Sequence, residues 1–454
     1  MDYVYSPITA ARVSVEALIN RGITRYLRRH NMSITLCVLA MIIGFNTAVA
    51  IQLLSAVLVL PLDSILCGSL LSVTFLSRSK KTLCIANTSN SCEINVDDLL
   101  ERKVVPMETI EAKAFLKGKV ILVTGGAGSI GSELCRQLLN YEPELLIALD
   151  TNETGLFDLV EGLRSRSHPR TASLSPFIGD ITDVQRMERF FAERQPDVVF
   201  HAAAYKHVSL LEQYPDLAIR TNAHATYHLC SLAQQYGTGC FVFVSTDKAA
   251  DPVSIMGASK RFAELIVQSQ AKSSQGTRFC TVRFGNVIGS RGSVVPIFAQ
   301  QIEQGGPLTV TDPQATRYFM TIPEACGLVI LSSAIAEQGG LYLLDMGDPV
   351  RIMDLAVKMI RQYGLREEQD ISIVYTGLRP GERLHETLVA IDEELLPTSN
   401  SKILRISHKG RVPSSKTVDQ WITALEESLQ EFDCIKLRKH LFQIIEGISY
   451  PRLR

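Results

Sequence analysis

Apolar residues along this chain fall into two kinds of run. Near the N-terminus, residues 33–60 are almost wholly apolar, and a second apolar run, residues 64–76, follows the short break Pro61-Leu62-Asp63. From residue 118 onward the apolar runs are short, and they alternate with segments that repeat apolar residues at helical spacing. The pattern predicts a hydrophobic N-terminal segment followed by an α/β domain.

The N-terminal runs predict attachment to a membrane. A spanning helix needs about 20 apolar residues, which the first run supplies. Basic residues flank the two runs on both sides, which favours a hairpin with both ends in the cytoplasm. The second run is short for a span, so one span with an interfacial or re-entrant segment stays open, as does a buried helical pair in a soluble protein. We expect residues 1–82 to form a membrane segment of one or two spans, followed by a linker at residues 83–117.

The alternating region predicts a doubly wound parallel sheet. Short apolar runs suit strands that are buried on both faces, and helical patterns lie between them. The expected strands are residues 119–124, 145–149, 177–181, 197–204, 241–245 and 279–284. We expect a Rossmann domain at residues 118–300. Residues 301–454 should form a smaller substrate-binding part with C-terminal helices from Ser399 onward, and this part can add further elements to the sheet.

A glycine-rich stretch follows the first expected strand. Glycines there let the backbone turn tightly and approach a pyrophosphate, which binds the amides at the start of the next helix. The second strand ends in an acid that can bind ribose hydroxyls and repel a 2′-phosphate, so NAD is favoured over NADP. The candidate cofactor ligands here are Thr124, Gly125, Gly128, Ser129, Ile130, Gly131 and the acid Asp150.

Further cofactor contacts are expected at the ends of the third and fourth strands, because ligands of such sheets gather at the carboxyl ends of strands. Asp180 with the following Ile181 could meet the adenine amino group. Small side chains after the fourth strand would let the cofactor lie against the backbone. They are Ala202, Ala203 and Ala204, and Asn222 completes the candidate set.

Composition removes several classes of function. Across 454 residues the formal net charge is −1, which argues against a dominant nucleic-acid surface. The ten cysteines are scattered, with no Cys-x-x-Cys pair and no Cys/His cluster at metal spacing. We expect free thiols in a reducing compartment and no metal site.

The stretch after the fifth expected strand carries the most chemistry. Thr246, Asp247 and Lys248 follow the strand, and Met256 precedes Lys260 by four residues. This arrangement resembles the active site of a short-chain dehydrogenase/reductase in which Met replaces the Tyr that exchanges a proton with the substrate. A thioether carries no such proton. Either the enzyme is inactive or its acid and base lie on other side chains, and the Asp-Lys pair favours the second interpretation.

From about residue 96 to the C-terminus the chain resembles the NAD-dependent UDP-N-acetylglucosamine 4,6-dehydratases of bacterial polysaccharide and glycan biosynthesis, in the extended short-chain dehydrogenase group. The resemblance rests on motifs that run through loops, which packing alone would not dictate. The matching stretches are residues 124–131, 201–212, 245–260, 283–298, 316–321 and 378–386.

That resemblance implies a UDP-sugar substrate, NAD, a homo-oligomer and a place at the bacterial inner membrane, with the catalytic domain facing the cytoplasm. Larger members of the family carry helices and an extra nucleotide-fold domain ahead of the catalytic one. In this chain the hydrophobic segment leads almost directly into the linker. We therefore expect the extra domain to be missing or reduced.

The implied reaction needs an acid and a base at sugar carbons 5 and 6. Resemblance to the family assigns Asp247 as the acid at the C6 oxygen and Lys248 as the base at C5, which requires surroundings that lower the lysine pKa and raise that of the aspartate. Lys260 would orient the nicotinamide ribose and help deprotonate the C4 hydroxyl. The group that takes the C4 proton stays open, with Thr246 and a water as one option. Met256 would be an apolar filler without a chemical role.

Substrate contacts are expected mainly from the C-terminal half. A diphosphate favours Arg, whose planar fork binds two phosphate oxygens at once. The resemblance also places Glu382 at the uridine ribose, Asn286 at a phosphate or sugar oxygen and Val295 against the uracil. The candidate substrate-binding residues are Lys206, Asn286, Val295, Arg317, Arg379 and Glu382. Each Arg could instead be a salt-bridged surface residue, and the Asp247-Lys248 pair a solvated ion pair.

Two other functions compete with dehydration. A UDP-sugar 4-epimerase would share the fold, NAD and the UDP site, but it would require Tyr at position 256 and would not need the Asp-Lys pair. A catalytically silent, NAD-binding membrane scaffold would explain Met256 without any chemistry. The scaffold leaves the neighbouring acid and base unexplained.

Overall fold

The computed structural model describes residue 99 and residues 109–165, 170–408, 410, 412–431 and 433–449. Both apolar N-terminal runs and most of the expected linker lie outside the described residues, and so does the predicted membrane segment. In the described part of the chain, no helix is both long and apolar enough to cross a bilayer.

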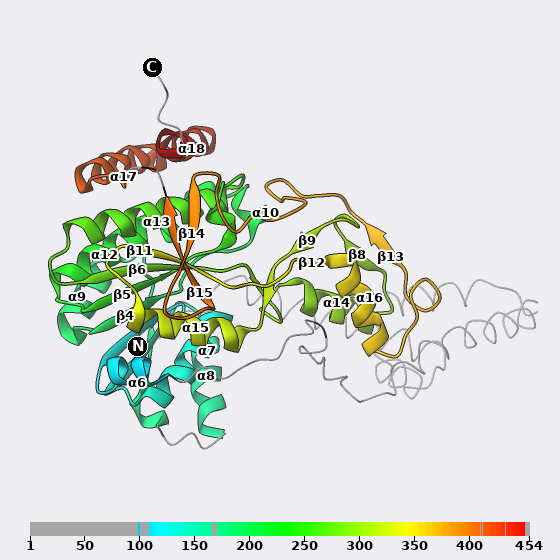
Figure 1. The fold of residues 1–454 in the computed structure, drawn as a ribbon, viewed down its shortest axis with the longest axis horizontal. Coiled ribbons are helices and arrows are strands. Elements are labelled where there is room, and N and C mark those ends of the chain that lie inside the picture. Colours follow the sequence, from blue (N-terminus) through cyan, green and yellow to red (C-terminus); the bar gives the residue numbers. More distant parts are fainter. Residues whose placement is uncertain are drawn as a thin grey trace, which may run out of the picture. The chain divides into compact units, whose positions relative to one another are not determined.

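A nine-stranded sheet forms the centre of the described chain (Figure 1), in the order β14-β15-β11-β6-β5-β4-β1-β2-β3. Neighbours from β3 to β11 pair in parallel, whereas β15 and β14 add an antiparallel edge. The strands are β1 (Val120–Thr124), β2 (Leu145–Asp150), β3 (Leu174–Ile178), β4 (Val198–His201), β5 (Cys240–Val244), β6 (Arg278–Arg283), β11 (Gly340–Leu344), β14 (Glu393–Pro397) and β15 (Ile403–His408). The predicted Rossmann-like α/β fold is confirmed.

Alternating side chains along each strand build an apolar layer on both faces of the sheet. In β1, Ile121 and Val123 join one layer and Leu122 joins the other. The first layer packs against α6 (Ile110–Leu116), α7 (Ser129–Leu138), α8 (Glu153–Ser165) and α15 (Ile322–Ile335), and the second against α9 (Val184–Arg194), α12 (Ala225–Gln235) and α13 (Ile255–Ser273). Because both faces are covered there, the central strands β1, β2, β4 and β5 are almost wholly apolar, which is the pattern that the sequence showed.

Some expected boundaries were displaced. The third strand was expected at residues 177–181, but β3 ends at Ile178, and Asp180 follows it in a turn. The expected linker contains α6, which packs into the first layer through Ala112 and Leu116. The tail from Ser399 was expected to be helical, but it first supplies β15. The segment becomes a strand because it pairs with β11, and the local sequence gives no information about that pairing.

A smaller lobe of short strands and two helices follows β6 (Figure 1). It pairs β7 with β10, β9 with β12 and β8 with β13, and has an apolar core of its own. The elements are β7 (Asn286–Val287), α14 (Val294–Glu303), β8 (Leu308–Val310), β9 (Thr316–Arg317), β10 (Phe319–Met320), β12 (Val350–Arg351), α16 (Ile352–Gln362) and β13 (Ile373–Tyr375). The expected boundary at residue 300 falls inside α14.

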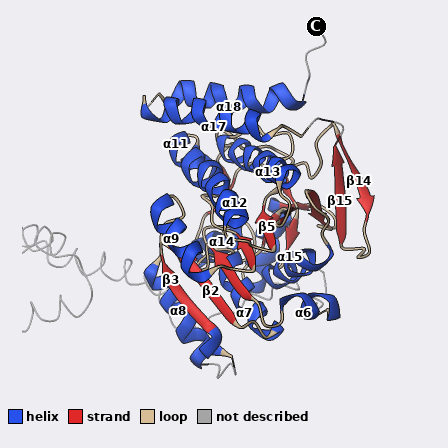
Figure 2. Cartoon of the chain, turned by 90° about the vertical axis from the view of Figure 1, so that its left-hand side faces the viewer, coloured by secondary structure: helices blue, strands red, loops and turns tan. Residues whose placement is uncertain are grey.

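The last two helices, α17 (Ser415–Gln430) and α18 (Cys434–Ser449), lie over α13 (Figure 2). Trp421 and Leu437 from this pair share an apolar cluster with Met256 and Phe262 of α13. As a result α13 is buried from Ile255 to Ala271, on its outer side as well as against the sheet. The helical end of the predicted C-terminal tail is confirmed.

Four charged side chains are buried together between α13 and the sheet. Arg283 of β6 donates to Glu264 at 2.9 and 2.7 Å and to Glu393 of β14 at 2.7 and 3.1 Å. Arg261 also donates to both carboxylates, at 3.0 and 3.3 Å. Glu264 in turn accepts a hydrogen bond of 2.7 Å from Ser245, at the end of β5. The cluster therefore ties the antiparallel edge of the sheet to the strand that carries the catalytic candidates.

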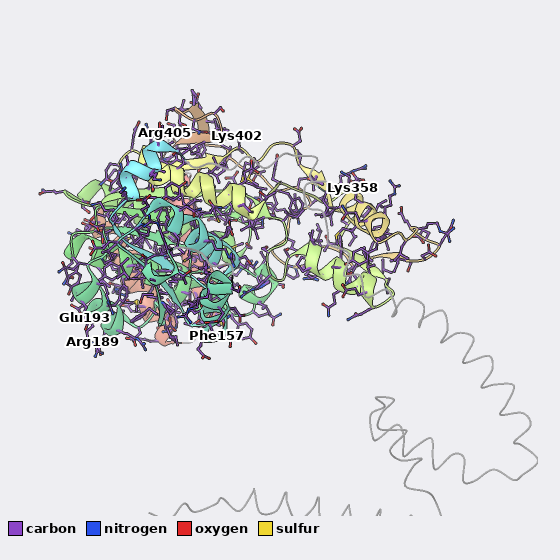
Figure 3. The ribbon with its side chains drawn as sticks, turned by 90° about the horizontal axis from the view of Figure 1, so that it is seen from below. Phe157, Arg189, Glu193, Lys358, Lys402 and Arg405 are labelled. Carbon is purple, nitrogen blue, oxygen red and sulfur yellow. The ribbon has the colours of Figure 1, made fainter. Side chains whose placement is uncertain are left out.

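The antiparallel edge carries charges on its outside. Lys402 pairs with Asp345 at 2.7 Å, and Arg405 of β15 pairs with Glu337 at 2.6 Å. Both cations lie on the same border of the molecule (Figure 3). Charged side chains of this kind discourage edge strands from pairing with another chain.

Candidate active site

The glycine-rich stretch forms a tight loop between β1 and α7. Gly125 has a φ of +72°, and a Cβ on it would lie 2.8 Å from the backbone of Ala203. A Cβ on Gly131 would lie 2.0 Å from the Gly125 carbonyl oxygen. Only glycine fits either position, and Gly128 caps α7 so that the helix amides face the loop. This is the backbone shape that a dinucleotide pyrophosphate requires.

Asp150, at the end of β2, is partly exposed beside this loop. Its carboxylate accepts from the Ala127 amide at 3.0 Å and from the Asn152 amide at 2.9 Å. These bonds fix its orientation at the carboxyl edge of the sheet, where ribose hydroxyls are expected. Asp180 is exposed and accepts from Thr182, whereas Ile181 is buried in the second layer.

The three alanines lie in an extended loop after β4. They are partly buried, and the Ala203 amide donates to Thr124 Oγ1 at 3.3 Å. Asn222 holds the same loop through two hydrogen bonds: its side chain accepts from the Tyr205 amide at 2.9 Å and donates to the Tyr205 carbonyl at 3.1 Å. Asn222 is buried in a π-helical turn, Ile219–His224, which joins α11 (Pro215–Ala218) to α12. In this structure Asn222 therefore positions the loop.

Asp247 and Lys248 lie in a short 3₁₀ turn, Asp247–Ala249, directly after β5. Asp247 is fully buried, and its Oδ1 accepts from Thr246 Oγ1 and from Lys248 Nζ, both at 2.9 Å. Its second oxygen, Oδ2, is buried without a hydrogen-bond partner among the described residues. The pair is therefore not a solvated ion pair, and one buried carboxylate oxygen of Asp247 makes no hydrogen bond with the described residues.

Lys248 is held from three sides. Besides Asp247, its ammonium donates to Asn286 Oδ1 of β7 at 3.0 Å and lies 3.5 Å from Glu386 Oε1. Burial lowers the pKa of Lys248, but the charges of Asp247 and Glu386 outweigh burial, so the pKa is raised. The lowered pKa that we required for a base is not found in this arrangement.

Arg317 of β9 lies on the other side of Glu386. Its Nε is 3.7 Å from Glu386 Oε1, and its Nη1 donates to the carbonyls of Thr316 at 2.7 Å and Leu384 at 3.1 Å. Glu386, to which the sequence assigned no role, thus links Lys248 to Arg317. Thr246, Asp247 and Asn286 join the same cluster through Asp247 and Lys248. Glu386 is 138 residues from Lys248 in the chain, so no local pattern could pair them.

Met256 and Lys260 occupy successive turns of α13. Met256 is 4% exposed and packs in the apolar cluster beneath α17 and α18, as expected of a filler. Lys260 Nζ donates to the Val244 carbonyl at 2.6 Å and lies 4.0 Å from the centre of the Phe243 ring. Burial lowers the pKa of Lys260 to about 7, against a smaller opposing effect of Glu264. Near neutral pH its charge is therefore only partial.

The loop after β7 crosses the glycine loop. Arg291 donates through its side chain to the Ala127 carbonyl at 3.1 Å, and its amide donates to Ser129 Oγ at 3.1 Å. Lys206 Nζ donates to the Arg291 carbonyl at 2.8 Å and to Ser290 Oγ at 3.4 Å. Arg291 is a second residue that sequence reasoning missed, although it lies inside a matching stretch.

The remaining substrate candidates are not joined to this cluster. Val295 is 3% exposed and packs in the core of the small lobe, so this structure does not offer it to a uracil. Arg379 and Glu382 form a turn with each other: the Arg379 amide donates to Glu382 Oε2 at 3.2 Å. Arg379 is exposed, and the turn leads directly to Glu386.

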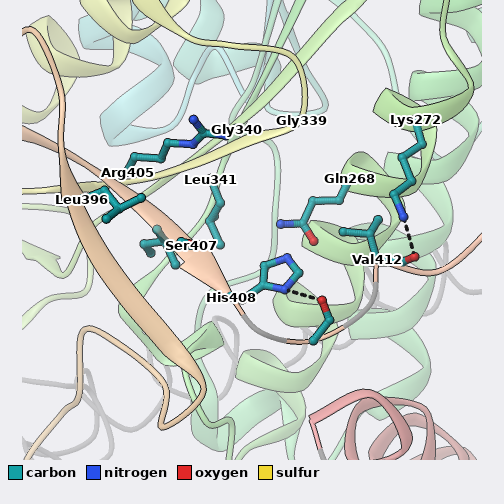
Figure 4. A pocket seen from close by; sticks show the side chains of 12 residues that line it. Gln268, Lys272, Gly339, Gly340, Leu341, Leu396, Arg405, Ser407, His408 and Val412 are labelled. Carbon is teal, nitrogen blue, oxygen red and sulfur yellow. Dashed lines mark hydrogen bonds between the residues drawn. The ribbon is translucent and has the colours of Figure 1, made fainter.

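A cavity of about 700 Å³ lies at the other edge of the sheet (Figure 4). It is lined by the second half of α13, the start of β11 and β15, including Lys272, Arg405 and His408. His408 donates to the Gly410 carbonyl at 3.0 Å, and Lys272 to the Val412 carbonyl at 2.9 Å. Because β11 begins here, this cavity is remote from the carboxyl ends that carry the catalytic candidates.

Residues 121–408 match the model of a family described as polysaccharide biosynthesis protein. The chain belongs to this family. It is 46% identical over 304 residues to the probable polysaccharide biosynthesis protein EpsC of Bacillus subtilis, covering 66% of this chain and 50% of EpsC. The chain thus spans about half the length of that relative.

Two further relatives carry the names of specific enzymes. A UDP-N-acetylglucosamine 4,6-dehydratase (inverting) of Campylobacter jejuni is 34% identical over 310 residues, covering 67% of this chain and 86% of the relative. A UDP-glucose 4-epimerase of Rickettsia akari is 32% identical over 300 residues, covering 64% and 84%. Relatives of this chain are therefore named for two different reactions on UDP-sugars.

Solved structures agree with the fold. Pen from Bacillus thuringiensis shares 33% identity with a TM-score of 0.59 and covers 66% of this chain and 90% of its own. DesIV, a dTDP-glucose 4,6-dehydratase of Streptomyces venezuelae solved with NAD bound, shares 26% identity with a TM-score of 0.52 and covers 59% and 87%. The expectation of NAD is in line with this neighbour and with the shape of the glycine loop.

Proposed function

We propose that this protein catalyses the NAD-dependent 4,6-dehydration of UDP-N-acetylglucosamine for polysaccharide biosynthesis. The observation that carries the proposal is the acid–base pair Asp247 and Lys248 at the end of β5, buried beside a helix that presents Met256 where an epimerase would require a phenol. Dehydration needs an acid and a base at neighbouring carbons, and epimerisation does not.

NAD is the cofactor of this proposal, and the residues of the glycine loop fit it. The glycine loop and the α7 amides would hold the pyrophosphate, and Asp150 the adenosine ribose. Bound there, NAD supplies the oxidation at sugar C4 and the matching reduction at C6.

Asp247 is the proposed acid. Its buried and unpartnered Oδ2 is costly to leave unsatisfied, and the C6 hydroxyl of a sugar would satisfy it. A proton on Oδ2 would pass to the C6 oxygen as the C6–O bond breaks, and that oxygen would leave as water. Thr246 and Lys248 hold the other oxygen, so the carboxyl group keeps one orientation throughout.

Lys248 is the proposed base. A ketone at C4 acidifies the C5 proton, which a neutral lysine nitrogen can take, and the same nitrogen can return a proton to C5 once C6 has been reduced. The reaction balances as loss of one water from the sugar. Asp247 and Glu386 favour the ammonium form, so Lys248 must first release a proton before it can take the C5 proton.

The product separates the candidate functions. Incubated with UDP-N-acetylglucosamine, the full-length protein in detergent should form the 4-keto-6-deoxy sugar, seen by NMR. UDP-N-acetylgalactosamine would instead support the epimerase, and absence of turnover the silent scaffold. Lys248→Ala should abolish the elimination, whereas Lys436→Ala, at a partly exposed lysine of α18 that pairs with Glu431, should leave it unchanged. Full activity of Lys248→Ala would remove Lys248 from the role of base.

A further inference from the structure

Among the described residues, Glu386 is the carboxylate that lies against both the proposed base and a proposed diphosphate ligand. Its Oε1 lies 3.5 Å from Lys248 Nζ and 3.7 Å from Arg317 Nε, and its side chain is only 7% exposed. A carboxylate buried between two cations is held in place by both. The same oxygen of Glu386 therefore contacts Lys248 on one side and Arg317 on the other.

The segment that carries Glu386 is fixed to β9. The Thr316 amide donates to the Leu384 carbonyl at 3.1 Å, and Thr316 Oγ1 lies 2.9 Å from His385 Nδ1. Arg317 Nη1 donates to the Leu384 carbonyl at 3.1 Å. These three contacts, made by the two residues just before Glu386, hold its backbone against β9. The position of Glu386 beside Lys248 is therefore fixed by the fold.

Lys248 itself lies against a close-packed backbone. A Cβ on Gly257 of α13 would lie 2.2 Å from the Lys248 carbonyl oxygen, so only glycine fits there. The charged groups that face the ammonium are Asp247 from its own turn, Glu386 from the loop behind β9, and Arg317 from β9, with the amide oxygen of Asn286 from β7. Two of these elements belong to the small lobe, which is expected to bind substrate.

We propose that Glu386 is a positioning residue of the dehydration site: its carboxylate holds the Lys248 ammonium in place and couples it to Arg317. The inference rests on the proposed function, since it assigns Lys248 the role of base. Neutralising Glu386 leaves Asp247 as the main anion at the ammonium, so Lys248 should release its proton more easily. Removing Arg317 deletes a cation near the ammonium, so Lys248 should then hold its proton more firmly.

The test measures Lys248 directly, without requiring turnover. Full-length protein is pulse-labelled with acetic anhydride across a pH series, and the acetylation of Lys248 is quantified by mass spectrometry, because only the neutral amine reacts. Glu386→Gln should move the midpoint of Lys248 labelling down by about one pH unit, the size expected for losing one opposite charge nearby. Arg317→Met should move it up. Glu303→Gln, at an exposed site of α14, should leave it in place.

The pH profile of kcat supplies the second readout. With Lys248 as base, the rising limb of the profile should shift to lower pH in Glu386→Gln by the same amount as the labelling midpoint. Unmoved labelling midpoints in both variants would overturn the inference, whether or not the wild-type protein dehydrates its substrate. A wild-type protein without dehydration would overturn the proposed function while the labelling result still decides the role of Glu386.

Discussion

At the scale of single residues, the most unusual group is the Lys260 ammonium. It lies inside the protein between the Val244 carbonyl and the face of Phe243, where burial lowers its pKa to about 7. An unfolded chain keeps a lysine pKa near its usual value of about 10.4. The native and unfolded states therefore hold different numbers of protons between about pH 7 and 10.

This difference predicts a rise of stability with pH. Below about pH 7 both states carry the proton, and above it the native state loses its proton first, so the free energy of unfolding should increase by up to about 1.4 kcal/mol per pH unit. Urea unfolding at pH 7, 8 and 9 measures this increase, as the change with pH in the difference between the unfolding free energies of wild type and Lys260→Met. Lys272→Met, an exposed lysine on the same helix, should track the wild type. A pH-independent difference between wild type and Lys260→Met would contradict the account.

The residues near Lys248 show how far sequence reasoning reached. The order of the chain placed Thr246, Asp247 and Lys248 just past the end of a buried strand, and the structure brings them together there. The sequence could not predict the contact of Glu386 with Lys248, because that contact depends on a loop that long-range hydrogen bonds fix to β9. Nor could it tell that Val295 faces the core of the small lobe.

At the scale of elements, the buried charges couple the sheet edge to the active-site strand. Glu393 of β14 accepts hydrogen bonds from Nη1 and Nη2 of Arg283 and from Nη1 of Arg261, and Glu264 in the same cluster accepts one from Ser245. A buried ion pair adds little net stability, but removal of one partner leaves an uncompensated charge. The cluster thus fixes the positions of β14, β6 and α13 relative to one another.

Glu393→Gln should therefore destabilise the protein by about 3 kcal/mol, the lower end of the range for breaking a buried pair. Glu394→Gln, the next residue on the same strand and exposed, should change stability far less. Denaturant unfolding of both variants measures the difference. Equal stabilities would show that the cluster carries no uncompensated charge when Glu393 is neutral.

Elements were predictable where their pattern was local. The glycine loop and the parallel strands follow from short apolar runs and turn residues, so β1, β2, β5 and β6 lie within one residue of expectation at either end. The hairpin of β14 and β15 was missed, because an edge strand that is exposed on one side resembles a helix or a loop in sequence. Tertiary pairing with β11 decides its structure.

At the scale of the whole molecule, the chain joins an apolar N-terminal segment to a dinucleotide-binding fold. Residues 33–60 exceed the length that a bilayer span requires, and basic residues flank the apolar runs. We therefore propose a membrane anchor with the catalytic domain on the cytoplasmic side. A homo-oligomer stays a prediction. The outer side of α13 does not provide a free surface for it, because α17 and α18 of the same chain cover that side.

The anchor predicts how the full-length protein fractionates. It should remain in the membrane pellet after extraction at alkaline pH and enter the supernatant only with detergent. In inverted inner-membrane vesicles, protease added outside should digest the catalytic domain. Recovery in the supernatant after alkaline extraction would contradict an integral anchor, and protection from protease would contradict the orientation.

The most direct test of the central claim follows one hydrogen. UDP-N-acetylglucosamine labelled with deuterium at C4 is incubated with the full-length protein and NAD, and the product is examined by NMR. Dehydration predicts deuterium at C6 of a 4-keto-6-deoxy sugar. Deuterium returned to C4 of UDP-N-acetylgalactosamine would contradict it.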